Sequence, residues 1–299
     1  AFITRGMSVQ SGLGIAAVAV AVYAYTAFTG SPLIAGSLDA KLQSETSKVL
    51  VFLPSEGFDP TEVAVPWRVL TDLGHSVVFS TPEGKESTGD PHVLNPSGLL
   101  HLAGIKPDAR VAYDALVESQ PFKQPLSFAD AMPQLESFHA VLLPGGHHPG
   151  MSDYLDSPQV HAFLQEYWKL KRPVGAICHG VLAVARSGLL KNAKTTSVPR
   201  YLERQGALVS WLAGYPTNDY QLSTTNNHYT QDEIEGSPGA TFIRGPLDLL
   251  APLLPDLDGS DTTHSHAFLV EDGHYLSARF WGDAYVFGRR LAAKMDEAL

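Results

Sequence analysis

Cysteine is almost absent from this chain, since Cys178 is the single one in 299 residues. One thiol cannot form an intramolecular disulfide and cannot build a thiolate-rich metal site. Acceptor sequences for N-glycosylation in a permissible form, Asn-x-Ser/Thr with x other than proline, are missing as well. Both absences are compatible with an intracellular or organellar setting.

Positive charge is also scarce. The chain has 21 Lys and Arg against 31 Asp and Glu, which gives a formal net charge of -10. No basic run appears, and no stretch interleaves basic with aromatic residues, so we expect no nucleic-acid partner. Hydrophobic residues make up 44% of the sequence. A chain of this length can therefore bury a sizeable core as one large domain or two small ones.

Charged residues are missing altogether between Gly6 and Leu38. Within this stretch, Leu13–Ile34 is apolar and long enough to cross the hydrocarbon core of a bilayer as a helix. Small residues spaced four apart would allow close helix packing in a membrane. A signal peptide and a buried soluble helix are the alternatives. We favour a single membrane-spanning helix over residues 11–36.

The predicted organisation of the chain follows from this segment. Residues 1–10 form an N-terminal arm, 11–36 the anchor, 37–47 a polar linker and 48–299 a folded domain. The sequence starts at Ala1 rather than Met, which we interpret as the removal of a targeting peptide. We therefore expect a membrane-anchored, organellar protein, with the mitochondrion as one candidate, whose folded domain lies outside the bilayer. Other subunits of a membrane complex are candidate partners.

Strand-like and helix-like patterns alternate after the linker. The apolar runs at 48–54, 75–81, 139–146 and 173–178 are typical of strands, and helical spacing covers Pro60–Leu73, Ser157–Leu170 and Val181–Arg186. Short, doubly apolar strands alternating with helices predict a mainly parallel sheet sandwiched between helices, which is a flavodoxin-like α/β fold. Near the end, an Asp-Gly pair between two alternating runs predicts a β-hairpin. Residues Asp283–Ala298 then supply a closing helix.

Cys178 follows one of these predicted strands directly, in the sequence PVGAICHG. Ligands of such sheets bind beyond the carboxyl ends of the strands. The glycine-rich turn Pro144–Gly150 follows another strand in the same way. Free cysteines are often buried and inert. A thiol at a sharp turn above a helix N-terminus should ionise more easily, however, so this position favours a nucleophile.

Four strings in this sequence resemble one family. GFDPTEVAVPW, LLPGGHHPGM and AICHG, in that order, look like the DJ/PfpI superfamily, also described as class I glutamine amidotransferase-like. The resemblance extends from about Lys48 to about Met295. It is closest to the larger branch that includes the heat-shock chaperone with glyoxalase III activity, which VEDGHYLSARFWGDAYVFGRRL near the C-terminus also resembles.

The resemblance implies roles for particular residues. Cys178 matches the nucleophile, His179 the residue after it, and Glu62 the acid on the first helix that hydrogen-bonds the thiol. Gly146 matches a backbone donor for an oxyanion, paired with the amide of His179. The chemistry agrees, because a carboxyl group close to a thiolate in a dry pocket should hold its proton and can shuttle it. Two fixed amides would stabilise the oxygen charge that develops when sulfur attacks a carbonyl.

The remaining site features concern the acid, the histidines and a possible covering segment. Members with a full triad place an acid further along the chain to orient the histidine, and Asp219 is the best candidate. His147 is the family-like pocket residue, and His148 belongs to the rim. We expect no metal site at these histidines because no third ligand has suitable spacing. The Pro- and Gly-rich segment Pro82–Gln124 is longer than a plain connection, which predicts a lid or binding loop.

The resulting hypothesis is glyoxalase III-like conversion of small dicarbonyls, such as methylglyoxal, to hydroxy acids, with no cofactor. Related cysteine hydrolase chemistry uses the same thiol but needs an acid to orient His179. Two hypotheses of other classes stay open. The fold could serve as a non-catalytic accessory subunit of a membrane complex, or Cys178 could be a redox-sensing thiol. Hydration of an unusual small substrate is a further enzymatic alternative.

Overall fold

The computed structural model of this chain describes residues 46–96, 104–204, 229–246 and 267–298. The chain divides into two units, Ala1–Glu45 and Thr46–Leu299, and every described residue belongs to the second. The predicted arm, membrane anchor and most of the linker therefore lie outside the described residues. Within the ranges given above, no helix is both long and apolar enough to cross a membrane.

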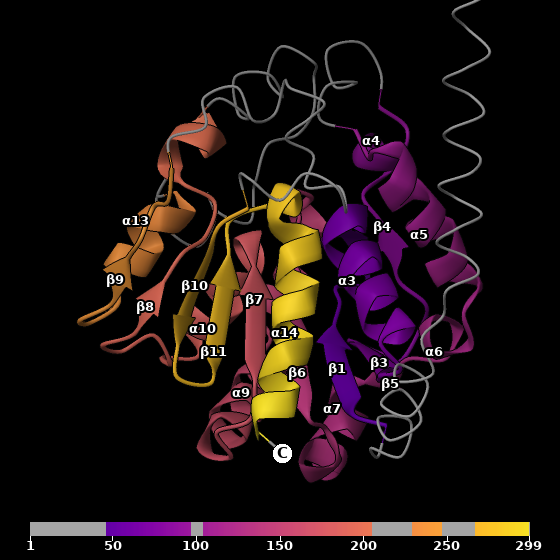
Figure 1. The fold of residues 1–299 in the computed structure, drawn as a ribbon, viewed down its shortest axis with the longest axis horizontal. Helices are drawn as coiled ribbons and strands as arrows, with labels where there is room; N and C mark the ends of the chain where they lie inside the picture. The colour runs from indigo at the N-terminus through magenta and orange to yellow at the C-terminus, as the bar shows by residue number, and fades with distance from the viewer. Residues whose placement is uncertain (1–45, 97–103, 205–228, 247–266, 299) are drawn as a thin grey trace, which may run out of the picture. The chain divides into compact units, whose positions relative to one another are not determined.

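Among the described residues, seven strands form the central sheet in the order β10-β11-β7-β6-β1-β3-β5 (Figure 1). Every neighbouring pair is parallel except β10 and β11, which form an antiparallel hairpin. This arrangement confirms the predicted mainly parallel α/β sheet. The strands are β1 (Lys48–Phe52), β3 (Ser76–Thr81), β5 (Leu126–Ser127), β6 (Ala140–Leu143), β7 (Val174–Ile177), β10 (Leu269–Asp272) and β11 (Tyr275–Ala278).

The central strands are buried on both faces, which is why they read as continuous apolar runs rather than alternating ones. All four residues of β6 and of β7 are buried. In β1, Val49 lies opposite Val77 of β3 on one side and Ala140 of β6 on the other. At the other end of the sheet, the predicted Asp-Gly turn is confirmed, with Gly273 in the left-handed region at φ +59°.

Helices cover both faces of the sheet (Figure 1). One layer contains α3 (Pro60–Asp72), α5 (Pro107–Glu118) and α14 (Ala284–Ala298), and the other α7 (Phe128–Ala131), α9 (Pro158–Lys169) and α10 (Val181–Arg186). The close approach of α14 needs the glycine in β7, because a Cβ at Gly175 would lie 2.9 Å from Cζ of Phe287. On the opposite face, Phe52 packs edge-on against Phe128 and Phe163.

Helix α3 shows why its bounds could be predicted from nearby residues. Its N-cap Asp59 accepts hydrogen bonds from the first-turn amides, and Pro60 occupies the first helical position. The helix ends at Asp72 with Leu73 as its C-cap, and Gly74 follows with a φ of +89°, the left-handed conformation that favours glycine. The predicted range Pro60–Leu73 is therefore confirmed to within one residue.

The prediction that Pro82–Gln124 forms a lid is wrong for its second half. That half forms α5 and α6 (Gln120–Lys123), and α5 packs against α3 as part of the helix layer, with Ala109 and Leu116 buried. Proline and glycine content suggested a loop, but an amphipathic helix lies between the prolines.

Further small elements are β2 (Glu56–Phe58), β4 (Thr88–Gly89), α4 (Pro91–Leu94), η2 (Met132–Ser137), η3 (Pro149–Met151), α8 (Ser152–Leu155), η4 (Cys178–Gly180), β8 (Lys194–Thr195), α13 (Thr230–Glu235), β9 (Thr241–Phe242) and η6 (Trp281–Asp283).

Candidate active site

Cys178 occupies a sharp turn between β7 and α10, through the single 3-10 turn η4. Its φ is +56°, in the left-handed region that a residue with a Cβ seldom adopts. The turn is possible because Gly180 packs directly on the neighbouring strand end, where a Cβ would lie 2.1 Å from the Leu143 carbonyl oxygen. The Ser197 hydroxyl donates a 2.7 Å hydrogen bond to the Cys178 carbonyl. Strain held in this way by surrounding contacts is typical of functional positions.

The Cys178 side chain is buried, with 1% of its surface exposed. Its Sγ lies 3.3 Å from Nδ1 of His179. Burial, and then the carboxyl groups of Glu62 and Asp59, raise the pKa of the thiol, while the His179 amide opposes the shift. The expectation of an easily ionised thiol is therefore wrong. The amide at the helix start does favour the anion, but desolvation and the two acids outweigh it.

Glu62 approaches the thiol from the first turn of α3 and is 1% exposed. Its Oε2 accepts a 2.8 Å hydrogen bond from the Gly145 amide, whereas its Oε1 is buried with no regular hydrogen bond among the described residues. Burial, and then the neighbouring Asp59 carboxyl, raise the pKa of Glu62 well above its ordinary value. Two buried acidic groups next to each other resist double ionisation, so the Glu62–Cys178 pair retains a proton at neutral pH.

Asp59 joins this acid to the glycine-rich turn after β6. Its Oδ1 accepts from the amides of Thr61 at 2.8 Å and Glu62 at 3.2 Å, and its own amide donates to the Gly145 carbonyl at 2.8 Å. The start of α3 and the turn are thereby held together. Burial raises the pKa of Asp59 to about 6 despite these two amide donors.

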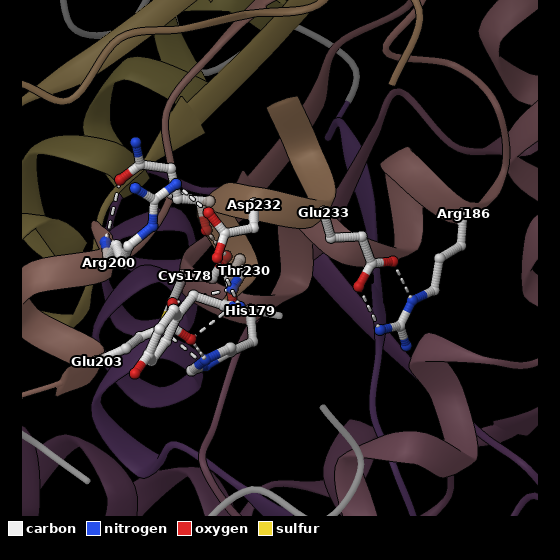
Figure 2. Close-up of polar contacts among 11 residues, drawn as sticks. Cys178, His179, Arg186, Arg200, Glu203, Thr230, Asp232 and Glu233 are labelled. Atoms are coloured by element: carbon white, nitrogen blue, oxygen red, sulfur yellow. Dashed lines mark hydrogen bonds and ion pairs between the residues drawn. The ribbon is translucent and has the colours of Figure 1, made fainter. Parts of the chain in front are cut away.

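On the other side of the thiol, His179 contacts an acid that the sequence did not reveal. Its Nε2 lies 3.1 Å from Oε1 of Glu203, and both side chains are buried (Figure 2). Asp219, the predicted orienting acid, lies outside the described residues. Glu203 follows Tyr201 and Leu202 in an ordinary amphipathic pattern. Only its burial distinguishes it from a surface glutamate, and no spacing signal could have selected it.

The turn after β6 provides the wall of the site. A Cβ at Gly145 would lie 2.7 Å from the His179 amide nitrogen and 2.8 Å from both Cys178 Cβ and Glu62 Oε2. Gly146, the predicted oxyanion donor, packs one residue further along, where a Cβ would meet the Gly57 carbonyl oxygen at 2.7 Å. The oxyanion role of the Gly146 and His179 amides stays a prediction.

Two further histidines belong to the same turn. His147 is half-buried, and its ring lies edge-on to His179 with ring centroids 4.9 Å apart. Burial, together with the neighbouring imidazole, lowers the pKa of His147 to about 3, which keeps it neutral. The Nδ1 of His148 accepts a hydrogen bond from the Gly150 amide at 3.0 Å. Across the described ranges, no group of three or more His, Cys, Asp or Glu could hold a metal ion.

The arrangement defines a class of protein: an open α/β fold with a cysteine at a strand-to-helix elbow, a histidine–glutamate pair on one side and, on the other, a buried glutamate whose pKa is raised. Such a site can attack a carbonyl carbon with sulfur and move protons on both sides of the new bond. The ThiJ/PfpI family-like model matches residues 53–232. The chain belongs to this family, and the predicted DJ/PfpI membership is confirmed.

Known relatives extend over most of the chain. An uncharacterized Schizosaccharomyces pombe protein is 28% identical over 261 residues, covering 85% of this chain and 86% of that one. A Bacillus subtilis protein with the provisional name cysteine protease YraA is 28% identical over 208 residues, covering 68% and 99%. The crystal structure of glyoxalase III from Candida albicans covers 83% of this chain and 97% of its own, with a TM-score of 0.57 and 18% identity. The TM-score shows that the two proteins share a fold, and at 18% identity the similarity concerns the fold alone.

Proposed function

We propose that this protein is a cofactor-independent enzyme that converts small 2-oxoaldehydes, such as methylglyoxal, to 2-hydroxy acids. The observation that carries the proposal is the position of the Cys178 sulfur between two groups that can carry a proton, Glu62 and His179. A thiol that is 1% exposed, facing a buried acid, suits a small carbonyl compound. The glyoxalase III named among the structural neighbours supports the same reaction class.

The first half of the reaction forms the bond to sulfur. The Cys178 proton moves to Nδ1 of His179, and Sγ attacks the aldehyde carbon. Glu62 gives its proton to the aldehyde oxygen, which leaves a hemithioacetal and a Glu62 carboxylate. This carboxylate then removes the hydrogen from the former aldehyde carbon, while the His179 imidazolium protonates the ketone oxygen. The product of this step is an enediol, with Glu62 protonated and His179 neutral again.

The second half completes an internal redox exchange, in which one carbon is oxidised and its neighbour reduced. Glu62 delivers its proton to the second carbon and takes back the proton of the first hydroxyl, which gives a thioester on Cys178. Water attacks the thioester with its proton passing to His179, and the C–S bond breaks. The imidazolium returns the proton to sulfur, and the hydroxy acid leaves. No electron acceptor is consumed.

The test is lactate formation from methylglyoxal by the purified protein without glutathione. We expect stereospecific lactate from the wild type and none from Cys178→Ser, while the surface variant Asp72→Asn keeps full activity. Lactate that forms equally with Cys178→Ser, or no lactate from the wild type, would overturn the proposal.

Hydrolysis of an ester or amide through an acyl-enzyme is a second candidate function. The His179–Glu203 pair favours it, because general-base activation of a nucleophile uses a histidine that is oriented by an acid. The provisional protease name of the B. subtilis relative supports it as well. Incubation with p-nitrophenyl acetate should give an adduct of 42 Da on Cys178 by intact mass, roughly one per chain. Release of nitrophenol that continues unchanged in Cys178→Ser would exclude this route.

The membrane anchor over residues 11–36, the organellar location and membership of a membrane complex all remain proposals about residues outside the described ranges. They rest on the absence of charge between Gly6 and Leu38. Alkaline carbonate extraction of cells making the full chain tests the anchor: retention in the pellet supports it, and release contradicts it. Blue-native electrophoresis then distinguishes an accessory subunit from a separate enzyme.

A further inference from the structure

Thr230 is a buried residue for which the reaction above has no use, although both of its donors point to the active site. It is the first residue of α13 and is 1% exposed. Its backbone amide donates to Oε2 of Glu203 at 2.9 Å, and its hydroxyl donates to Oε1 of the same carboxyl at 2.8 Å. One residue therefore contacts both oxygens of the acid beside His179.

These contacts decide how Glu203 can meet His179. Glu203 Oε1 accepts from the Thr230 hydroxyl and also lies 3.1 Å from Nε2 of His179. A carboxylate is an acceptor only, so two donors on Thr230 leave Nε2–H of His179 as the third. The imidazole then carries its proton on Nε2 and presents Nδ1 as an acceptor to the Cys178 sulfur, 3.3 Å away.

Helix α13 is in turn fixed to the helix that follows the cysteine elbow. Arg186, near the end of α10, donates from Nε to Glu233 Oε1 at 2.7 Å and from Nη2 to Glu233 Oε2 at 2.9 Å (Figure 2). Its Nη1 also donates to Asp156 at 2.7 Å. The Arg186 side chain is 11% exposed, and a two-pronged contact of this kind sets orientation as well as distance.

A second arginine holds α13 from the segment that carries Glu203. Arg200 forms an ion pair with Asp232, and its backbone amide donates to Gln231 at 3.1 Å. Glu203 lies three positions further along the chain. The contacts thus form a closed circuit from Cys178 through α10, Glu233 and α13 to Thr230, and back through Glu203 and His179.

We propose that Thr230 is a positioning residue of this site: its hydroxyl and amide fix the Glu203 carboxylate so that His179 holds the Nε2–H tautomer and faces Cys178 with Nδ1. Thr230 touches neither substrate nor sulfur in this role. The inference rests on the proposed cysteine chemistry for its effect on turnover. Its effect on the histidine, however, is a property of the protein without substrate.

The experiment combines two substitutions with two measurements. Thr230→Val removes the hydroxyl donor while keeping size, shape and backbone amide, and Thr230→Ser keeps the hydroxyl as the matched control. In nitrogen-15 spectra of histidine-labelled protein, the His179 signals, assigned with His179→Gln, should report an Nε2–H tautomer in the wild type and in Thr230→Ser. Thr230→Val should show a mixture of tautomers. For methylglyoxal, kcat should fall about 10-fold in Thr230→Val with KM within twofold, and by less than threefold in Thr230→Ser.

Each outcome decides the proposal. An Nδ1–H tautomer of His179 in the wild type overturns the proposal without any variant. The proposal can therefore be tested even if the Thr230→Val protein does not fold. Equal spectra for the wild type and Thr230→Val overturn it as well. If the wild type makes no lactate but the Thr230→Val substitution changes the tautomer of His179, the proposed reaction is wrong and the positioning role is supported. A fall in kcat that Thr230→Ser shares in full would mean that the residue acts through packing alone.

Discussion

Two buried glutamates, Glu62 and Glu203, belong to the site around Cys178, and their surroundings differ. Glu62 lies on α3, accepts one backbone hydrogen bond and has an Oε1 without a regular partner among the described residues. A second buried acid, Asp59, is its neighbour. Glu203 accepts from both donors of Thr230 and meets His179. Glu62 therefore has one backbone donor and a neighbouring acid, whereas Glu203 has several hydrogen-bond donors.

The comparison teaches that the role of a carboxyl group here comes from its neighbours. Burial and the neighbouring acid raise the pKa of Glu62 and so favour its protonated form, because the ionised form lacks solvent and is repelled by Asp59. Several donors make Glu203 an acceptor that orients an imidazole. Two acids of one residue type can thus supply a general acid and an orienting group to the same thiol. The predictions that follow test this division.

The largest effect should come from Glu62→Gln. The amide can still accept from Gly145 but cannot exchange a proton, so we expect kcat for methylglyoxal to fall by about 1,000-fold, within the range for loss of a general acid–base. Glu203→Gln should cost only about 10-fold in the same assay. If the two variants lose equal activity, or if Glu203→Gln loses more, the division of roles is wrong and the hydrolase candidate gains support.

The same Glu62→Gln variant should also change the thiol. The carboxyl group of Glu62 is, after burial, the largest cause of the raised pKa of Cys178. Removing it should lower that pKa, so that iodoacetamide alkylation begins at a lower pH than in the wild type. A thiol that reacts more readily while turnover falls would show that Glu62 acts in proton transfer. An unchanged alkylation profile would contradict the electrostatic coupling.

Gly145→Ala should affect both sides of the thiol together. The new methyl group would lie within 2.7–2.8 Å of the His179 amide, Cys178 and Glu62. Forced displacement of these groups should lower kcat by about 100-fold and destabilise the fold by about 1–3 kcal/mol. Lactate assays and urea denaturation measure the two effects. Gly236→Ala is the control, since its nearest contact would be 3.3 Å away; a similar loss there would contradict the steric account.

Asp59→Asn should raise stability in a way that depends on pH. The folded-state pKa of Asp59 is raised from 3.8 to about 6 by burial. Between these two pH values the folded protein binds more protons than the unfolded chain. The wild type therefore loses stability as the pH rises from about 4 to about 6. Asparagine keeps the N-cap and removes this penalty, which is about 2–3 kcal/mol. Denaturation at pH 7 should show the gain, and at pH 4 it should vanish; a gain that is constant with pH would refute the assignment.

Ser197→Ala should give the smallest effect. The hydroxyl donates to the Cys178 carbonyl at 2.7 Å in a buried position, and its loss leaves that acceptor without this donor. We expect a destabilisation of about 1–2 kcal/mol and a change in kcat of less than about tenfold. Ser152→Ala, which removes a half-buried hydroxyl bonded to the Pro149 carbonyl, is the matched control. Equal losses of stability and kcat in both variants would show that the Ser197 hydrogen bond stabilises the elbow no more than the half-buried Ser152 hydrogen bond stabilises its own turn.

The fold could be predicted closely because its signals are local. The apolar run of β1, the cap-proline start of α3 and the Asp-Gly turn before β11 each determine structure within a few residues. Helix α10 was predicted with its observed bounds, Val181–Arg186. The lid predicted for Pro82–Gln124 failed in its second half, because composition alone does not separate a loop from a helix bounded by prolines. The position of Cys178 after β7 was equally local.

The sequence by itself determined the sheet, the elbow and the pair of neighbours Cys178 and His179, since these depend on periodicity, turn residues and adjacency. Only the tertiary structure decided which acid meets His179, because Glu203 is 24 positions away and Thr230 a further 27. It also decided the direction in which the pKa of Cys178 is shifted. Ionisation depends on desolvation and on charges from α3 and the turn after β6, and these surround the thiol only when the layers are packed.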